Sequence, residues 1–262
     1  MNIRERIDKY LEENKQNKEL QEFDKVVDTV IKETESHLRL ISEQMCHYDM
    51  HDKTHSEKVL ENIENLLEDG GIERLSIMEA YLIYLSAYVH DVGMAMPDWA
   101  FKMVINVEKY EYVCHSPDTY YSEIKKEILE QKTSLYGSFG RIKDLVFCTE
   151  TEDALIDNLV AEIYRYEKFR CGYQNELNDK LKLSLKDYND YSEILRMEYF
   201  RQYHGERSAL FIRNLWRIFA PALKEASARN IAESLAVICA SHCQDFKKVE
   251  QLRRKQEVLR RE

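Results

Sequence analysis

Residues 81–94, with the sequence YLIYLSAYVHDVGM, decide how the rest of the chain is interpreted. Nine of the ten residues from Tyr81 to His90 are apolar, aromatic or small, and the tenth is the histidine. A helix that is apolar on all sides is usually buried. Burying the imidazole of His90 and the carboxylate of Asp91 is costly unless each is paired or bound to a metal. The stretch therefore predicts a core helix that ends in a His-Asp pair at an interior site.

The flanking residues predict where this helix begins and ends. Ser76 followed by Glu79 has the spacing of a capping box, so we expect the helix to begin after Ser76. Gly93 lies where a glycine in the left-handed conformation commonly ends a helix. We therefore expect the chain to leave the helix through a left-handed turn at Gly93.

A second histidine-bearing stretch precedes the core helix at residues 47–59, HYDMHDKTHSEKV. Thr54 and Glu57 form another capping-box pattern, which predicts a helix that begins at Thr54 with His55 in its first turn. An apolar stripe then predicts the buried face of this helix: Val59, Leu60, Ile63, Leu66 and Leu67. Gly70-Gly71 is expected to end the helix. Three other histidines are interpreted as surface residues, namely His37, His47 and His115, while His51 is placed beside the ligands or at the surface.

The composition indicates an all-α protein. Only 7 Gly and 3 Pro occur in 262 residues, too few for the many turns of a strand-rich fold. With 44% hydrophobic and 33% charged residues, the chain suits one large or two modest globular domains. Residues 1–45 carry the three-and-four spacing of an amphipathic helix.

Charge and cysteine usage exclude several classes of protein. The formal net charge of −10 argues against a uniformly basic surface for long nucleic acid, although a local basic patch remains open. No apolar run approaches the roughly 18 residues of a membrane span, and the N-terminus has no apolar signal core. The 6 cysteines have no C-x-x-C pairing, which indicates reduced thiols. We expect a cytoplasmic protein without a membrane partner.

The last third of the chain supplies two more histidines. Helices are predicted over residues 198–219 and from 224 to about 243, carrying His204 and His242. Cys239 and Cys243 are four residues apart and share a helix face near His242. A zinc site is one interpretation of that trio, but small buried apolar side chains are the favoured one.

Residues 99–200 give the least regular pattern, with short helical stretches at 124–129, 154–166 and 191–200. The segment is rich in tyrosine. Partly buried packing is one explanation, and a pocket for a ring-bearing ligand is the other.

His55, the His90-Asp91 pair, His204 and His242 come from different predicted helices, which is how metal sites are built in all-α cores. Imidazole and carboxylate ligands suit Mn, Fe, Ni, Co or Zn. One or two such ions lower the pKa of a water molecule and neutralise charge on phosphoryl oxygens. The pattern favours phosphoester chemistry.

The order His55, His90-Asp91, His204, His242, with the contexts THSEKV and SAYVHDVGM, resembles the HD-domain superfamily of metal-dependent phosphohydrolases. The resemblance implies that His55, His90 and Asp91 bind one metal ion. It also implies that His204 and His242 help to hold a second ion, with Asp91 as the bridging carboxylate.

Two further stretches, RQYHGERS and ICASH, are most similar to HD modules that precede an Hsp90-like ATPase region in larger bacterial proteins. Such proteins imply a C-terminal ATPase domain as a possible partner, and the charged run 247–262 is interpreted as a helix that continues into sequence beyond this chain.

The resemblance implies an all-α, HD-domain-like helical bundle with a helical insertion, forming one domain over residues 1–262. Its expected parts are N-terminal helices (1–45), a metal-site core (46–97 and 198–246), an insertion (98–197) and a C-terminal helix (247–262). The family pattern ends with a further aspartate. Asp245 is one candidate, and a residue beyond Glu262 is the other.

Three functions follow as hypotheses. The first is a metal-dependent phosphohydrolase that acts on a nucleotide or related phosphoester, with Arg207 either contacting a substrate phosphate or forming an ion pair. The second is a weakly active or inactive HD sensor that binds metal or nucleotide and signals to a partner domain. The third is a helical interaction protein with incidental histidines.

Overall fold

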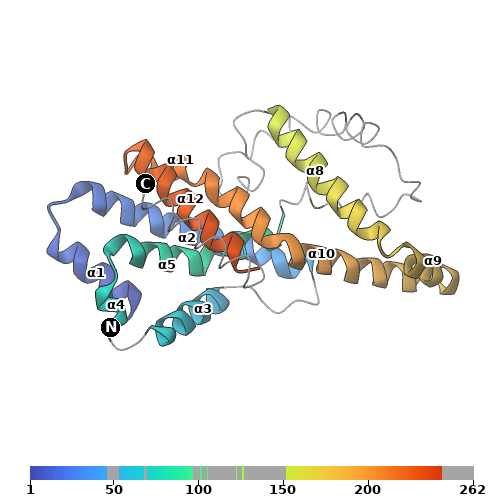
Figure 1. Cartoon of the computed structure of the whole chain (residues 1–262), viewed down its shortest axis with the longest axis horizontal. Helices are drawn as coiled ribbons and strands as arrows, with labels where there is room; N and C mark the ends of the chain where they lie inside the picture. Colours follow the sequence, from blue (N-terminus) through green and yellow to red (C-terminus); the bar gives the residue numbers. More distant parts are fainter. Residues whose placement is uncertain are drawn as a thin grey trace, which may run out of the picture. The chain divides into compact units, whose positions relative to one another are not determined.

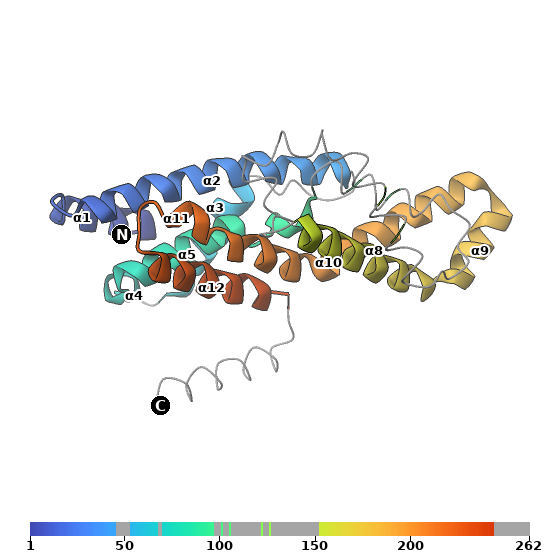
Figure 2. The same ribbon diagram turned by 90° about the horizontal axis from the view of Figure 1, so that it is seen from above.

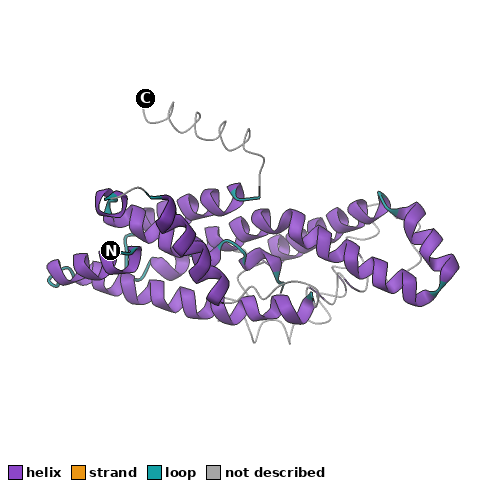
Figure 3. Cartoon of the chain, turned by 90° about the horizontal axis from the view of Figure 1, so that it is seen from below, coloured by secondary structure: helices purple, strands orange, loops and turns teal. Residues whose placement is uncertain are grey.

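The computed structural model describes residues 1–45, 53–67, 70–96 and 152–243, together with residues 101, 105, 122 and 126. All regular structure in these residues is helical (Figure 3), which confirms the all-α prediction. No helix within these ranges is long and apolar enough to cross a membrane.

Figure 1 labels most of the described helices along the chain. In order they are α1 (Ile3–Glu13), α2 (Lys18–Gln44), α3 (Lys53–Leu66), α4 (Gly71–Arg74), α5 (Ile77–Val89), the 3-10 turn η1 (Val92–Met94), α8 (Glu152–Cys171), α9 (Gln174–Leu183), α10 (Leu185–Asn214), α11 (Trp216–Phe219) and α12 (Glu225–Ser241).

The described chain divides into two compact units. The first unit comprises residues 1–31, the described residues of 53–93, and 203–243. The second comprises residues 32–45 and the described residues between 94 and 202. The single domain with an insertion stays a prediction.

Helix α5 is the core helix of the first unit, as its apolar sequence predicts. It packs against α1, α3 and α12, and the two ribbon views show it running beside α1 (Figures 1 and 2). Tyr81, Leu85 and Val89 are fully buried on it. The capping box is confirmed: Glu79 N–H donates to Ser76 Oγ at 3.2 Å, and Ser76 N–H donates to the Glu79 carboxylate at 2.8 Å.

Helix α3 differs in detail from the prediction. It begins at Lys53, so Thr54 lies inside the helix rather than at its cap. Leu60 is buried, but Leu66 is 83% exposed because the helix ends there, and the small Ser56 is buried instead. The buried face therefore lies nearer the start of the helix, on the side of His55.

A polar network ties α1, α2 and α5 together in the first unit. Arg4 donates from both terminal nitrogens to the two Asp24 oxygens at 3.0 and 3.1 Å. Tyr81 O–H donates to Asp24 Oδ1 at 2.9 Å. Asp24 is only 9% exposed, and each of its oxygens has a donor. This buried carboxylate is satisfied by the protein itself.

The second unit has an aromatic and polar interior. The Tyr166 and Tyr199 ring centroids are 4.9 Å apart, and Tyr199 O–H donates to the Glu162 carboxylate at 2.9 Å. The buried Arg170 donates to Tyr188. These tyrosines pack in the core, which fits the first explanation of the tyrosine-rich segment.

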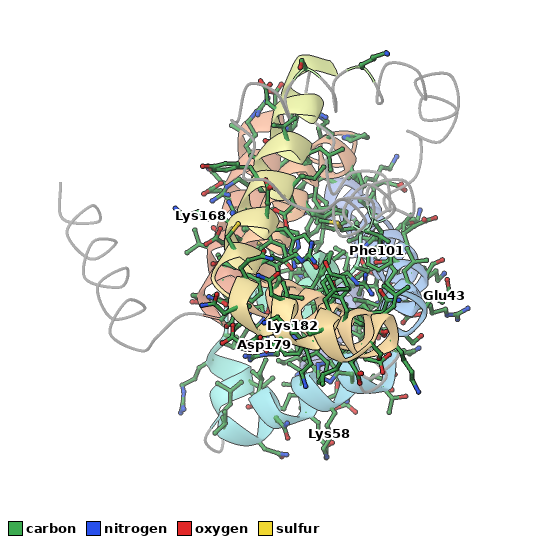
Figure 4. The ribbon with its side chains drawn as sticks, turned by 90° about the vertical axis from the view of Figure 1, so that its right-hand side faces the viewer. Glu43, Lys58, Phe101, Lys168, Asp179 and Lys182 are labelled. Carbon is green, nitrogen blue, oxygen red and sulfur yellow. The ribbon has the colours of Figure 1, made fainter. Side chains whose placement is uncertain are left out.

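Helix α10 begins at Leu185 and runs unbroken to Asn214, so the two helical stretches predicted at 191–200 and 198–219 are largely one helix. In the second unit, Lys182 and Asp179 pair on the surface of α9 at 2.8 Å (Figure 4).

The prediction that His37 is a surface residue is wrong. His37 is 1% exposed on α2. It falls on the face that also buries Thr34, Leu38 and Ile41. The three-and-four spacing of these positions puts them on one side of a helix, so periodicity alone could have indicated its burial.

Candidate metal centre

The His-Asp pair lies at the C-terminal end of α5, within the first unit. His90 is the C-cap residue of α5, and its backbone N–H donates to the Ser86 carbonyl oxygen at 3.1 Å. The His90 Nδ1 atom lies 3.1 Å from the Ala87 carbonyl oxygen. A carbonyl oxygen only accepts, so Nδ1 carries the proton, and Nε2 is left to face the interior.

Asp91 lies at the centre of a histidine cluster. Its side chain is 7% exposed. Oδ2 lies 3.2 Å from His55 Nε2 and 2.9 Å from His90 Nε2. Oδ1 lies 3.1 Å from His204 Nε2 and 3.5 Å from His242 Nε2. The two oxygens of one carboxylate are thus divided between two pairs of imidazoles.

The structure brings together all five residues predicted as metal ligands. Helix α3 contributes His55 from its first turn, and α10 contributes His204. His242 is the C-cap residue of α12. Because α5 packs against both α3 and α12, the ends of these helices meet where α5 ends. His55 and His242 keep 36% and 31% of their side chains exposed, so the cluster is open to solvent on their side.

The nitrogen atoms of this cluster face one another in a way that requires a cation. His242 Nδ1 donates to the Cys239 carbonyl oxygen, so the Nε2 atom of the neutral ring is a lone-pair acceptor. That atom lies 2.7 Å from His204 Nε2 and also faces Asp91 Oδ1. His242 Nε2 and Asp91 Oδ1, 3.5 Å apart, are both acceptors and repel each other unless a proton or a metal ion lies between them.

The electrostatics of the cluster agree with this. Burial raises the pKa of Asp91, but interactions with the rings of His204, His242, His55 and His90, in their protonated form, lower it by more, so the net shift is downward. Burial lowers the pKa of His242, but Asp91 and Cys243 raise it to about 10. The pKa of His204 is raised for the same reasons. The site therefore stabilises positive charge at its centre.

Gly93 is required for close packing and not for a left-handed turn, so that prediction is wrong. Among the described residues, Gly70 is the one with positive φ. A Cβ at Gly93 would clash with the backbone of α10, at the His204 carbonyl oxygen and the Ser208 nitrogen. The glycine lets the turn after Asp91 lie directly against α10.

Two further side chains of α10 hold this turn in place. Ser208 Oγ accepts from Gly93 N–H at 2.8 Å and donates to the His90 carbonyl oxygen at 2.6 Å. Arg207 Nε donates to the Gly93 carbonyl oxygen at 2.7 Å, and Arg207 is 1% exposed. Sequence reasoning missed Ser208, although its position four residues after His204 puts both on one helix face. A contact between Arg207 and a substrate phosphate stays a prediction.

Cys243 lies at the site, although the favoured interpretation of the sequence made it a small buried apolar side chain and a zinc site with Cys239 and His242 was the alternative. Its Sγ atom lies 3.2 Å from His204 Nε2 and 3.2 Å from His242 Nε2. Burial raises the pKa of the thiol, but the two histidines lower it to about 6. Cys239 is 1% exposed, as predicted for a small apolar side chain, whereas Cys243 is exposed.

Several sequence predictions fall outside the described residues. They concern His47, His51, His115, the candidate ligand Asp245 and the C-terminal segment 247–262.

The donor set fits divalent transition metals. Two groups of donors, His55-His90-Asp91 and His204-His242-Cys243, each have their ligand atoms within 4.8 Å of one another. Imidazole nitrogens with one carboxylate and one thiol are ligands that Mn, Fe, Co, Ni and Zn accept. In metal sites, the ring nitrogen of a histidine ligand that does not bind the metal usually donates a hydrogen bond that orients the ring. The hydrogen bonds from His90 Nδ1 and His242 Nδ1 to backbone carbonyl oxygens have this role here.

Comparison with known proteins agrees with this geometry. No curated protein and no solved structure is significantly similar to the chain. A family model described as HD-CE matches residues 45–262, which include every residue of the histidine cluster. The match confirms the predicted HD-type module, and the chain therefore belongs to the HD-CE family.

Proposed function

We propose that this protein is a metal-dependent phosphohydrolase that acts on a nucleotide or a related small phosphoester. The observation that carries the proposal is the division of the two Asp91 oxygens between His55 and His90 on one side and His204 and His242 on the other. A carboxylate placed in this way is suited to bridge two ions.

Bound divalent ions would lower the pKa of a water molecule and neutralise charge on the phosphoryl oxygens. The chain's own residues prepare the site for this chemistry. The Ala87 and Cys239 carbonyl oxygens fix the tautomers of His90 and His242, so that both Nε2 lone pairs point inward. Ser208 and Arg207 hold the backbone on either side of Asp91.

The nature of the substrate follows from charge and access. A net charge of −10 disfavours binding of long duplex nucleic acid by counterion release, which requires a basic track. A small phosphoester needs only the local positive charge of the metal site. The partly exposed His55 and His242 leave one side of the site accessible to it. A C-terminal ATPase domain as partner belongs to the same proposal.

The first test is the metal content of protein purified without chelator, measured by elemental analysis. We expect one or two equivalents of Mn, Fe, Co, Ni or Zn in the wild type and none in the His90→Ala/Asp91→Ala double variant. Glu206→Gln, an exposed change on α10, should keep the metal. The same three proteins are then assayed with p-nitrophenyl phosphate, bis-p-nitrophenyl phosphate and nucleoside triphosphates.

Hydrolysis that depends on the metal and is absent from the double variant would support the enzyme. Absence of metal from the wild type, even after incubation with Mn²⁺, would overturn the proposal. Metal binding without turnover of any of these probes would overturn the hydrolase and favour the regulatory HD module, in which ligand binding is passed to a partner domain.

A further inference from the structure

We infer that Cys243 binds metal as a thiolate and completes the second metal position beside His204 and His242. The inference rests on the proposed metal site, which it extends by one ligand of a different chemical type. It predicts that the two metal positions are unequal: an imidazole-carboxylate position at His55-His90-Asp91, and a position that also has sulfur.

The geometry places the sulfur among the donors. Cys243 Sγ and the Nε2 atoms of His204 and His242 form a triangle with sides of 2.7, 3.2 and 3.2 Å. Tetrahedral zinc, with Zn–N and Zn–S bonds of about 2.1 and 2.3 Å, separates its donors by about 3.3–3.6 Å. The two nitrogens need to move apart by about 0.7 Å, and the sulfur from each nitrogen by about 0.4 Å, to bind one ion. Asp91 Oδ1, 3.1 Å from His204 Nε2, provides a fourth donor.

Close backbone packing brings the thiol to this position. Gly205, next to His204, lies against the end of α12. A Cβ built on Gly205 would lie 3.0 Å from Cys243 Sγ and 3.3 Å from the Ala240 carbonyl oxygen. A side chain here would push Cys243 away from His204. The absence of a side chain at Gly205 thus allows the sulfur to lie against the histidine pair.

The charge of the donors is the second reason to expect Cys243 to bind metal as a thiolate. Of the six donors in the two groups, Asp91 and Cys243 are the ones that can be anionic, and the other four are imidazoles. Two divalent ions would share the single charge of Asp91 without the cysteine. When the Sγ–metal bond forms, the thiol proton is released to solvent and a second negative charge remains at the site. Sulfur also makes this position more selective for Zn, Fe or Co than for Mn.

The test uses Co²⁺ as a probe, because a thiolate bound to cobalt gives an intense sulfur-to-cobalt charge-transfer band that nitrogen and oxygen ligands do not give. The metal-free wild-type protein is titrated with Co²⁺ and its near-ultraviolet and visible spectra are recorded. We expect the charge-transfer band in the wild type and its loss in Cys243→Ser. That variant should bind the second ion more than about 10-fold more weakly, since even outer partners of metal ligands contribute 10–100-fold.

Matched variants separate ligation from general effects. Cys239→Ala, one helical turn earlier on α12, and Cys171→Ser, in the second unit, should both keep the band. Cys243→Asp supplies an anionic oxygen in place of sulfur, so it should recover binding of the second ion without the band. Zinc X-ray absorption of the wild type, which needs no variant, should show one sulfur per protein molecule at about 2.3 Å.

The outcomes distinguish this inference from the proposed function. Binding of Co²⁺ with visible bands but without the charge-transfer band, or an unchanged band in Cys243→Ser, would overturn the thiolate ligand and leave the histidine-aspartate site intact. No binding of Co²⁺ by the wild type would overturn both.

Discussion

Two buried aspartates of the first unit have opposite surroundings. Asp24 accepts hydrogen bonds from Arg4 and Tyr81, groups that always donate at neutral pH. Asp91 instead faces four imidazole nitrogens at 2.9–3.5 Å. Two of these nitrogens are lone-pair acceptors in the neutral ring, because the opposite ring nitrogen of His90 and of His242 donates to a carbonyl oxygen. The fold satisfies Asp24 completely, but Asp91 requires a proton or a metal ion in addition.

Burial alone therefore does not identify a functional carboxylate. Asp24 and Asp91 are 9% and 5% exposed, so both are buried. What differs is whether the neighbouring atoms are donors or acceptors. A buried charge that the protein itself neutralises serves the structure, and one that it leaves to an external cation marks a binding site.

The largest expected effect is the loss of stabilisation by metal in Asp91→Asn. A ligand that binds only the folded state raises the free energy of unfolding by about 4 kcal/mol at a concentration 1,000 times its Kd. We expect an increase of this order for the wild type with excess Zn²⁺ or Mn²⁺, and close to none for Asp91→Asn. Denaturant unfolding with metal and with chelator measures the difference.

For Asp24→Asn we expect a loss of stability that does not depend on metal. The substitution removes the buried charged partner of Arg4, which keeps its ion pairs with the more exposed Asp8 and Asp28 at 2.9 and 3.6 Å. We expect the free energy of unfolding to fall by about 2–3 kcal/mol with or without metal. The increase caused by metal should be unchanged. If metal stabilises the Asp24 variant less than the wild type, or stabilises the Asp91 variant fully, the two aspartates do not differ in their need for a cation.

The second-largest loss of stability is expected for Gly93→Ala, which changes the backbone packing next to Asp91. The added methyl group would overlap the backbone of α10 at His204 and Ser208, atoms that cannot turn away as a side chain can. Over-packing of this kind costs about 1–3 kcal/mol, and we expect the upper end of that range in the metal-free protein. Because His204 must shift, binding of Co²⁺ should also weaken by about 10-fold.

Gly172→Ala is the control for this variant. Gly172 is exposed, and its added Cβ would have a single close neighbour, the Phe169 carbonyl oxygen at 3.2 Å. It should change stability little and metal binding not at all. Equal stability losses in the two glycine variants would show that close packing against α10 is not what Gly93 provides.

How much of the fold and of the site could be predicted depends on how far apart in the sequence the residues that determine each feature lie. The end of α5 at the His-Asp pair follows from an apolar run of adjacent residues, and its start follows from the capping pattern at Ser76. Both are local, and both were predicted correctly. The inward direction of His90 also follows from a bond to Ala87, three residues away.

The features that could not be predicted depend on contacts between distant residues. Gly93 has its role because α10 passes over it, with Ser208 bonded to it across a separation of 115 residues. Cys243 reaches His204 across 39 residues, at a point where Gly205 lets two helices approach. In both cases the sequence displays a glycine or a cysteine, but only the fold shows its neighbour. His37 is different, because it was predicted at the surface although its helical spacing could have indicated burial.

The smallest expected effect concerns Tyr81, which completes the surroundings of Asp24. Burial raises the pKa of Tyr81, and the Asp24 carboxylate raises it further. A pKa raised in the folded state means that the folded protein holds this proton more tightly than the unfolded chain. The resulting stability is fully present below the unfolded pKa of about 10 and is lost as the pH rises above it.

Tyr81→Phe removes both the hydrogen bond to Asp24 and this proton. At neutral pH it should lower the free energy of unfolding by about 1 kcal/mol, because Arg4 still holds the carboxylate. As the pH rises from about 9 to about 11, the wild type should lose this advantage, so the two unfolding curves should converge. The stability of Tyr164→Phe, a change at an exposed tyrosine, should follow that of the wild type over the same pH range.

A constant difference in stability between the wild type and Tyr81→Phe would mean that Asp24 does not depend on the Tyr81 proton. The hydrogen bonds from Arg4 would then be enough to stabilise the Asp24 carboxylate, and the contrast with Asp91 would depend on that one donor group.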